Sequence, residues 1–350
     1  MIRMDENMPF LLKYENVAWY ENGKVRILDR RVYPEEIRFV VCTEYPEVVQ
    51  AIRDMVTQSA GPYTAVGMGM ALAAYQCRGK GRSEQERFLQ LAAFELAHSR
   101  PTAANRYGQI TEACFRAAAE ALKNGKDPVE AITGATIASL NRRYSTMQTV
   151  GDSLADLIPK NGAILTQCFG ETIIGTVIRA MKKKGKTFRA YCAETRPYLQ
   201  GARLTSGCFA DMGIDTTVIT DNMVAFLMEQ GKIDLFTSAA DTITQDGHIA
   251  NKIGTLQIAI LAKYFGIPYY VTGIPDRDKR SAEDILIEMR DPQQVLSYRG
   301  IRNTLPSVKG IYPAFDVTPP ELITGIVTDK GVYRPELLST YFNTEVKQFY

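Results

Sequence analysis

Short apolar runs alternate with helical segments from about Gly151 onward, and no other feature restricts the fold as strongly. The apolar runs expected to form strands are residues 163–166, 188–193, 216–219, 233–237 and 269–271. The segments expected to form helices between them are residues 173–184, 203–212, 222–230 and 252–265. A strand, a helix and a second strand in this order form a right-handed unit with parallel strands, so the pattern predicts a Rossmann-like parallel sheet.

The chain before this region has a different pattern. Residues 17–20 and 24–28 are separated by a turn at Asn22-Gly23, which is typical of a β-hairpin. Residues 86–98 and 109–123 are rich in helix formers and carry broad apolar faces. These faces indicate helices that pack around a common core.

We therefore expect an α/β protein with two domains, which suits a length of 350 residues. Residues 1–150 are predicted to form a small, mainly helical N-terminal domain with a short β-hairpin. Residues 151–350 are predicted to form a Rossmann-like catalytic domain. The boundary is expected between residues 124 and 158.

Composition excludes several classes of partner. The 41 Lys and Arg residues nearly balance the 39 Asp and Glu residues, so no global positive field exists to hold nucleic acid or an anionic membrane. No apolar run approaches the roughly 20 residues of a membrane helix, and the N-terminus lacks the pattern of a secretory signal. We expect a cytoplasmic protein that binds neither nucleic acid nor membranes.

Cysteine and histidine usage argues against a structural or catalytic metal. The chain has 6 Cys and 2 His residues, and the cysteines are scattered without any CxxC pair. This spacing fits neither a disulfide framework nor a zinc site. A reduced chain without a bound metal is therefore expected.

Polar residues follow the predicted strands, at the edge where parallel sheets bind ligands. Residues 166–171 follow the first strand, 194–197 the second, 220–222 the third and 238–241 the fourth. Asn251-Lys252 is expected to open the next helix, where backbone N–H groups and an ammonium group can together hold a phosphate. The sequence thus brings a thiol, a carboxylate and several cationic or amide groups to one edge of the sheet.

Cys168, Asp241 and Arg100 are candidate functional residues, and each also has a structural interpretation. The helix dipole can favour a thiolate at Cys168, but a buried and inert cysteine fits the same position. Asp241 ends an apolar run, where partial desolvation would suit a proton-transfer group, but it can equally cap a turn. Arg100 follows a predicted helix and can clamp a phosphate or cap the carbonyl groups of that helix.

Several motifs together resemble those of the methylthioribose-1-phosphate isomerases. The motifs are residues 194–205 (ETRPYLQGARLT), Asp241, residues 251–255 (NKIGT), residues 287–291 (IEMRD) and residues 312–323 (YPAFDVTPPELI). That family shares its fold with the ribose-1,5-bisphosphate isomerases and with the regulatory subunits of the eukaryotic initiation factor 2 exchange factor. The resemblance extends from about Trp19 to Tyr333.

The resemblance implies roles for particular residues. It makes Cys168 and Asp241 the catalytic pair. The residues that it places at the substrate and its phosphate are Gln58, Ser59, Ala60, Arg100, Gln200, Asn251 and Lys252. It further implies a homodimer, a sugar-phosphate substrate, a role in methionine salvage, and neither a metal nor an organic cofactor.

This chain departs from the family pattern at three places. Gln58-Ser59-Ala60-Gly61 stands where the family typically has Arg-Gly-Ala-Pro in a phosphate-contacting loop, so one cation is missing there. An amide in place of a guanidinium forfeits a charge-assisted contact of roughly 1.5–3 kcal/mol. Phe169 replaces a typical Asn, and residues 238–242 (SAADT) replace a run that usually includes Gly-Ala-Asp-Arg.

Two functions from different classes follow from these observations. The first is an aldose–ketose isomerase acting on 5-methylthioribose 1-phosphate or a close analogue such as 5-deoxyribose 1-phosphate, with ribose 1,5-bisphosphate as an alternative substrate. The second is a non-catalytic protein that senses a sugar phosphate or nucleotide, as the initiation-factor relatives do. The presence of both a thiol and a carboxylate favours the enzyme, because a pure binding site has no need of both groups.

Overall fold

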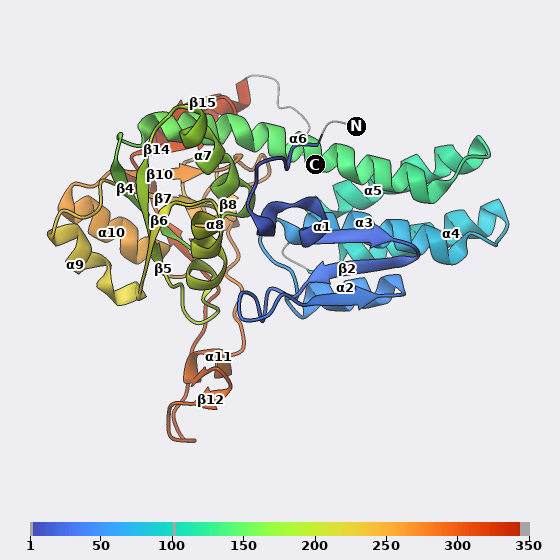
Figure 1. Ribbon diagram of the computed structural model, residues 1–350, viewed down its shortest axis with the longest axis horizontal. Coiled ribbons are helices and arrows are strands. Elements are labelled where there is room, and N and C mark those ends of the chain that lie inside the picture. Colours follow the sequence, from blue (N-terminus) through green and yellow to red (C-terminus); the bar gives the residue numbers. More distant parts are fainter. Residues whose placement is uncertain (1–2, 101–102, 344–350) are drawn as a thin grey trace. The chain divides into compact units, whose positions relative to one another are not determined.

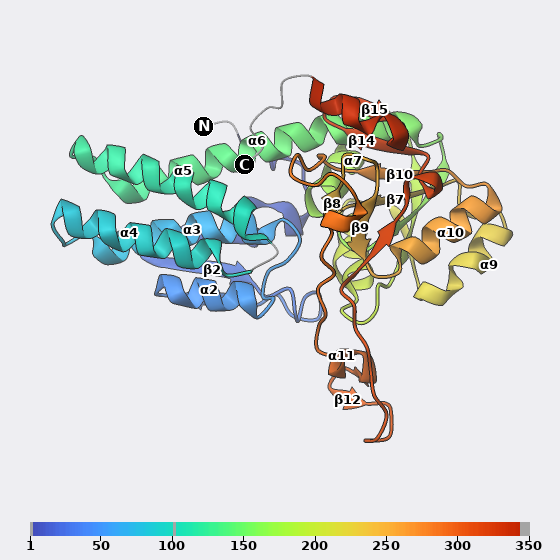
Figure 2. The same ribbon diagram turned by 180° about the vertical axis from the view of Figure 1, so that it is seen from behind.

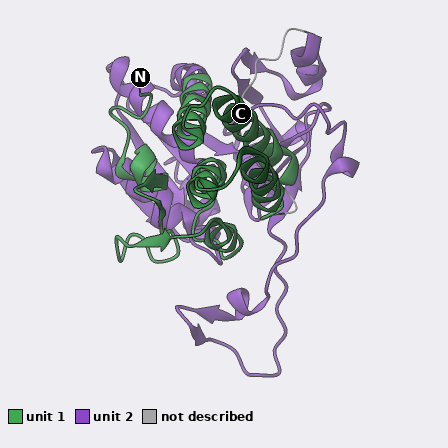
Figure 3. Ribbon diagram, turned by 90° about the vertical axis from the view of Figure 1, so that its right-hand side faces the viewer, with its two compact units in different colours: residues 1–146, 348–350 green, residues 147–347 purple. Residues whose placement is uncertain are grey.

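The computed structural model describes residues 3–100 and 103–343. Its internal contacts divide these residues into two compact units, coloured separately in Figure 3. Unit 1 extends to Thr146, and unit 2 begins at Met147. The long helix α6 (Pro128–Leu157) contributes residues to both units. No helix of the described part of the chain is long and apolar enough to cross a membrane.

Unit 1 combines a small antiparallel sheet with helices. After η1 (Phe10–Leu12) and α1 (Tyr14–Val17), the sheet has the order β1 (Ala18–Glu21), β2 (Lys24–Leu28) and β3 (Phe39–Cys42). The helices that follow are α2 (Tyr45–Arg53), α3 (Gly61–Cys77), α4 (Arg82–Ala97), α5 (Ala104–Lys123) and the first part of α6. The predicted hairpin is confirmed, because β1 pairs with β2 around Asn22 and Gly23. Both turn residues have the positive φ that this turn requires, 49° and 77°.

The centre of unit 1 is α3, which is buried on nearly all sides. Its glycines allow this burial by close packing. A Cβ atom on Gly67 would come within 2.6 Å of the Thr136 side chain on α6, and one on Gly69 within 2.9 Å of Leu96 on α4. These two glycines therefore serve helix packing.

Unit 2 is built on a seven-stranded sheet within the described residues. Its order is β15 (Gly331–Tyr333), β14 (Gly325–Thr328), β10 (Tyr269–Thr272), β7 (Leu235–Ala239), β4 (Gly162–Gln167), β5 (Phe188–Ala193) and β6 (Asp215–Ile219). Neighbouring strands are parallel except at the edge, where β15 is antiparallel to β14. The predicted fold class, an α/β protein with a parallel sheet after a helical region, is confirmed.

Helices cover both faces of this sheet (Figures 1 and 2). On one face lie α7 (Glu171–Lys183) and α8 (Ser206–Asp211), which follows a π-helical turn, η3 (Gly201–Thr205). On the other face lie α9 (Val224–Glu229), preceded by η4 (Asp221–Met223), and α10 (Thr255–Phe265). The predicted single helices over 203–212 and 222–230 are thus each divided into a short α-helix and, before it, a turn of another helix type, π in the first and 3₁₀ in the second. The predicted strand over 233–237 lies two residues later.

A second, three-stranded sheet lies beside α10. It has the order β13 (Phe315–Thr318), β9 (Ile249–Lys252) and β8 (Thr242–Ile243), with antiparallel pairing. The prediction that Asn251 and Lys252 open a helix is wrong, because they end strand β9. Gly254, with φ of 101°, breaks the strand, and α10 starts at Thr255.

Between β10 and β13 the chain forms an arm that extends away from the sheet of unit 2 (Figures 1 and 2). The arm contains α11 (Gln293–Leu296), β11 (Ser297–Tyr298) and β12 (Ile301–Arg302). The guanidinium of Arg196 donates to the carbonyl groups of Gln294, Val295 and Ser297 at its base. Short helical turns complete the unit: η5 (Ala282–Asp284), η6 (Pro320–Leu322) and η7 (Pro335–Asn343).

Candidate active site

The connectivity of the large sheet determines where a ligand can bind. The chain runs from β4 through β5 to β6 on one side and then returns to place β7 on the other side of β4. Ligands of such sheets bind beyond the carboxyl ends of the strands at this reversal point. Cys168 follows β4 directly, and Asp241 follows β7 two residues after its end. The topology therefore brings the two predicted catalytic residues to the same end of neighbouring strands.

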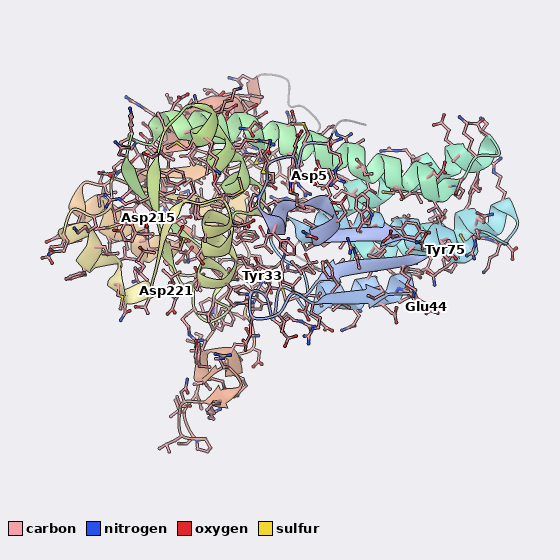
Figure 4. The ribbon with its side chains drawn as sticks, viewed as in Figure 1. Asp5, Tyr33, Glu44, Tyr75, Asp215 and Asp221 are labelled. Atoms are coloured by element: carbon pink, nitrogen blue, oxygen red, sulfur yellow. The ribbon has the colours of Figure 1, made fainter. Side chains whose placement is uncertain are left out.

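The backbone of Cys168 is fixed by the loops next to it. Its N–H donates to the hydroxyl of Thr195 at 2.9 Å, and its carbonyl accepts from the hydroxyl of Thr205. Cys168 has φ of 63°, an unfavourable conformation for a residue with a side chain, and costs of order 1 kcal/mol or more are typical there. Thr195 is itself held by its N–H, which donates to Asp221 at 2.8 Å. Asp215 begins β6 and Asp221 follows its end, and both are labelled in Figure 4, so the contact of Thr195 with Asp221 lies beyond the carboxyl end of β6.

The environment of the Cys168 thiol favours its neutral form. Burial raises its pKa to about 11, the nearby Lys252 ammonium lowers it, and Asp241 raises it. The sequence left open a thiolate favoured by a helix dipole and a neutral, buried cysteine, and the direction of this pKa shift supports the neutral thiol. Desolvation of the sulfur outweighs the effect of the charges and dipoles around it.

Asp241 lies in a more open position. Its backbone N–H donates to the carbonyl of Ala250 at 2.9 Å, which ties the loop after β7 to strand β9. The side chain is exposed, whereas the sequence predicted partial burial. The apolar run that suggested burial ends at Ala240, and the chain turns away from the core at Asp241 to enter β8.

Lys252 supplies a buried positive charge next to this pair. Its side chain is 4% exposed, and its Nζ atom lies 4.3 Å from the centre of the Phe315 ring. Burial lowers its pKa, the charge of Arg290 lowers it further, and Cys168 and Asp241 oppose this change. Lys252 forms no ion pair within the described residues. An ammonium group in such a position is suited to bind an anion.

A network of buried hydrogen bonds connects Lys252 to the strand that carries Cys168. The amide of Asn251 donates to the Thr255 hydroxyl at 3.0 Å, and that hydroxyl lies 2.8 Å from Oε1 of Gln167. Nε2 of Gln167 donates to the carbonyl of Ile253 at 2.9 Å. Because Gln167 immediately precedes Cys168, this network fixes the end of β4 against the end of β9. Gln167 and Thr255 were not predicted as site residues.

Asp316 is a further residue that the sequence did not identify as part of the site. Its carboxylate accepts hydrogen bonds from the N–H groups of Gly254 at 2.7 Å and Leu256 at 3.1 Å, so it caps the start of α10. Burial raises its pKa to about 6, although both hydrogen bonds act in the opposite direction. Asp316 pairs with Asn251 in the register of β13 and β9. Only this strand pairing shows that Asp316 lies beside Asn251.

Arg290, Glu288 and Tyr312 complete the polar surroundings of Cys168. Nε of Arg290 donates to Glu288 at 3.0 Å, and the guanidinium lies 5.8 Å from the centre of the Phe315 ring. The Tyr312 side chain is 2% exposed, and burial raises its pKa while Arg290 lowers it. Its hydroxyl makes no hydrogen bond of standard geometry within the described chain. The motifs at residues 287–291 and 312–323 contain these residues, but no pattern in the sequence assigns them a role.

Gln200 lies close to the loop that holds Cys168. It precedes Gly201, whose Cβ position would be 1.8 Å from the Ala193 carbonyl and 2.9 Å from the Thr195 hydroxyl, so only glycine fits there. The Gln200 side chain is 3% exposed, and Oε1 has no hydrogen-bond partner among the described residues. This buried acceptor is available to a donor on a ligand.

The other predicted binding residues belong to unit 1. Gln58 is 4% exposed, Ser59 has φ of 59°, and Ala60 precedes the first residue of α3. Arg100 lies in the turn after α4, where its guanidinium is near the Tyr107 hydroxyl; burial raises the pKa of that hydroxyl and Arg100 lowers it. These residues stay predictions for substrate binding.

Metal binding is not indicated by the side chains of residues 3–100 and 103–343. These residues contain no group of three or more His, Cys, Asp or Glu side chains arranged to hold a metal ion. The groups around Cys168 can donate hydrogen bonds, transfer protons and bind an anion.

Comparison with known proteins places the chain in a family. The model of the Initiation factor 2 subunit family matches residues 64–335. The chain belongs to the initiation factor 2 subunit family. A methylthioribose-1-phosphate isomerase of Chloroflexus aurantiacus is 37% identical over 336 residues, which cover 92% of this chain and 96% of that relative. A 5-deoxyribose 1-phosphate isomerase of Clostridium botulinum is 36% identical over 338 residues, covering 91% and 95%.

Solved structures of members of this initiation factor 2 subunit fold are similar over most of the chain. A 5-methylthioribose 1-phosphate isomerase from Pyrococcus horikoshii has a TM-score of 0.79 at 32% identity and covers 94% of both chains. The delta subunit of a translation initiation factor eIF-2B from A. fulgidus has a TM-score of 0.78 at 30% identity, covering 92% of this chain and 96% of that one. Both the fold and the resemblance predicted from the sequence are confirmed.

Proposed function

We propose that the protein is an aldose–ketose isomerase that converts a 5-substituted ribose 1-phosphate to the corresponding ribulose 1-phosphate. The observation that carries this proposal is the grouping of a neutral thiol at Cys168, the exposed carboxylate of Asp241 and the buried ammonium of Lys252. The names of the curated relatives support an isomerase of sugar phosphates. Within this class, 5-methylthioribose 1-phosphate and 5-deoxyribose 1-phosphate are the proposed substrates.

The reaction needs acid catalysis because phosphate esterifies the C1 hydroxyl, so the ring cannot open by loss of an anomeric proton. In the proposed mechanism the bond between C1 and the ring oxygen breaks, and the ring oxygen gains a proton. The hydrogen on C2 then moves to C1, and the C2 hydroxyl loses its proton to become the ketone. Proton gain and loss balance, so the product is an isomer of the substrate.

Asp241 is the proposed group that transfers protons at the ring oxygen and the C2 hydroxyl. A carboxylate in an open position can exchange protons between successive turnovers. Cys168, held neutral by burial, is the proposed hydrogen-bond donor that stabilises the transition state on the other side of the sugar. Buried Phe169, next to Cys168, contributes to the exclusion of water.

The remaining predicted residues are proposed to bind substrate. Lys252 would hold the phosphate, while Asn251 and Gln200 would orient the sugar hydroxyls. Gln58, Ser59, Ala60 and Arg100 in unit 1 are proposed phosphate contacts.

We also propose a cytoplasmic homodimer that acts in methionine salvage. The arm of unit 2 supports the oligomeric part of this proposal, because it holds large apolar side chains in solvent, among them Leu286 at 82% exposure, Ile301 at 70% and Leu305 at 73%. A second copy of the chain would cover them.

A non-catalytic sensing protein is the second candidate function. The similarity to the eIF-2B delta subunit favours it, because that structure matches almost as well as the isomerase structure. In this alternative the same anion-binding groups hold a sugar phosphate or nucleotide without turnover.

Phosphorus NMR distinguishes the two functions. The protein is mixed separately with 5-methylthioribose 1-phosphate, 5-deoxyribose 1-phosphate, ribose 1-phosphate and ribose 1,5-bisphosphate. Conversion of the anomeric phosphate signal to that of a primary ketose 1-phosphate is the expected result and identifies the preferred 5-substituent. Binding that shifts the signals of these compounds without any conversion would overturn the isomerase in favour of the sensing protein.

A further inference from the structure

A short antiparallel pairing at the base of the arm holds Arg290 and Tyr312 in register. The segments that lead into and out of the arm run side by side in both views (Figures 1 and 2). The backbone N–H of Arg290 donates to the carbonyl of Tyr312 at 2.8 Å. Met289 and Pro313 form an antiparallel bridge next to this hydrogen bond. The backbone therefore fixes the positions from which the two side chains extend.

The hydroxyl group of Tyr312 is buried and has no hydrogen-bond partner. The side chain is 2% exposed, and no described residue makes a hydrogen bond of standard geometry with the hydroxyl. The carboxylate of Glu288 is bonded instead to Nε of Arg290, at 3.0 Å. Burial of a hydroxyl without a partner lowers stability, and native proteins rarely leave such a group unpaired unless it serves another purpose.

The charges around this hydroxyl make it a donor. Burial raises the pKa of Tyr312, the guanidinium of Arg290 lowers it, and the sulfur of Cys168 raises it. Burial has the largest effect, so the phenol keeps its proton at neutral pH. A phenol oxygen next to a guanidinium turns its lone pairs toward the cation, which directs its hydrogen away from Arg290. That hydrogen is available to an acceptor on a ligand bound beside Cys168.

We propose that Tyr312 is a specificity-determining residue that donates a hydrogen bond to the C3 hydroxyl of the sugar. The inference rests on the proposed function and goes beyond it by adding a residue that recognises the substrate. In that function phosphate esterifies the oxygen on C1, and Asp241 exchanges protons with the ring oxygen and the C2 hydroxyl. Carbon 5 carries no oxygen in 5-deoxyribose 1-phosphate or 5-methylthioribose 1-phosphate. The C3 hydroxyl is therefore the acceptor of the sugar that still lacks a donor.

A buried donor of this kind penalises a ligand that cannot pair with it. A site that hydrogen-bonds a substrate hydroxyl rejects the analogue without that hydroxyl, because the buried protein group then stays unpaired. We therefore expect the protein to prefer 5-deoxyribose 1-phosphate to 3,5-dideoxyribose 1-phosphate. These two compounds differ at C3 alone, so a comparison between them reports on that position.

The first test measures the melting temperature of the full-length Tyr312→Phe variant, which lacks only the hydroxyl oxygen. Because the hydroxyl has no partner in the folded protein, the melting temperature should stay the same or rise. Tyr341→Phe is the matched control, since the hydroxyl of this buried tyrosine donates to Asp329 at 2.8 Å. Its melting temperature should fall by about 1–4 °C. An equal fall in Tyr312→Phe would show that the Tyr312 hydroxyl is already paired, which would overturn the proposal.

The second test measures kcat/KM of the wild type and of Tyr312→Phe for both compounds. The wild type should prefer the compound with the C3 hydroxyl by at least about 100-fold. Tyr312→Phe should lower kcat/KM for 5-deoxyribose 1-phosphate roughly 10- to 100-fold, the loss expected for one hydrogen bond to a buried group. The value for 3,5-dideoxyribose 1-phosphate should stay within a few-fold of the wild type.

The pair of compounds separates recognition from a structural defect. A displaced site would impair both compounds alike, whereas a lost hydrogen bond affects only the compound that carries the C3 hydroxyl. Equal losses for both compounds, or an unchanged kcat/KM for 5-deoxyribose 1-phosphate, would overturn the role of Tyr312 and leave the isomerase in place.

The role of Tyr312 can also be tested without turnover. If neither compound is isomerised, the proposed function has failed, and dissociation constants from isothermal titration calorimetry replace kcat/KM in the same comparison. Selective loss of affinity for 5-deoxyribose 1-phosphate in Tyr312→Phe would then still support recognition of the C3 hydroxyl. A wild type that neither converts nor binds these compounds would overturn both proposals.

Discussion

Cys168 and Asp241 follow neighbouring strands, but the protein gives them different surroundings. Burial raises the pKa of Cys168 to about 11, so the thiol keeps its proton and can donate a hydrogen bond. The Asp241 side chain is exposed to solvent. Two titratable groups with contrasting environments are typical of acid–base sites.

Asp241→Asn should abolish turnover, with a loss of at least about 100- to 10,000-fold in kcat, because an amide cannot transfer the proton. The fold and phosphate binding should be retained, since the exposed side chain contributes little to packing. Single-turnover assays with the substrate identified by NMR, together with phosphate titration, would measure both effects. A rate close to wild type would remove Asp241 from the mechanism.

Cys168→Ser should lose at least about 100-fold in kcat if the thiol acts on the substrate. Serine keeps a donor of similar shape, so the melting temperature should change little and KM should stay within a few-fold. A variant that works at the full rate would return Cys168 to the role of a buried, inert cysteine.

The small sheet β8–β9–β13 carries more of the site residues than any single strand of the large sheet does. Strand β9 carries Asn251 and Lys252, and β13 carries Phe315, which lies against Lys252, and Asp316. The capping of α10 by Asp316 fixes the start of that helix directly after Lys252. Substitutions in β13 should therefore alter the position of Lys252.

Asp316 should make stability depend on pH. Its pKa is about 6 in the folded protein and about 3.9 in an unfolded chain, so its favourable contribution is complete below pH 4 and is lost as pH rises through 6. The difference corresponds to at most about 2–3 kcal/mol. Asp316→Asn should remove this pH dependence of stability. Urea unfolding of the wild type and the variant at pH 4 and pH 7 measures the free energy of unfolding of both proteins. The prediction would be contradicted if the difference in unfolding free energy between the wild type and Asp316→Asn were the same at both pH values.

The sequence predicted those features of the fold that depend on local residue patterns and on strand order. The alternation of strands and helices sufficed to predict the parallel sheet, and the rule for its carboxyl edge sufficed to place Cys168 and Asp241 at that edge. Lys252 was placed in a helix because its strand is defined by pairing with β13, some sixty residues later. The role of Asp316 depends on the same distant pairing, which no periodicity reveals. Arg290 is placed by a separate bridge between Met289 and Pro313.

The arm provides a prediction about assembly. Ile301→Asp places a charge where an apolar side chain is 70% exposed, so it should disrupt a dimer formed through the arm while leaving the monomer folded. The dissociation constant should rise at least about 10-fold in sedimentation analysis. Lys309→Asp, on the same arm, is the control for charge. An unchanged dimer in Ile301→Asp would exclude the arm as the interface.

Helix α6 contributes residues to both units, so the local stability of each unit depends on the same helix. A helix forms cooperatively, since each turn supports the next, so loosening one part of it also promotes fraying in the rest. Tyr144 is buried in unit 1 on α6, and Leu154 and Ala155 are buried in unit 2 on the same helix. Damage to the packing of α6 in unit 1, as in Tyr144→Ala, should therefore speed amide hydrogen exchange at Leu154 in unit 2.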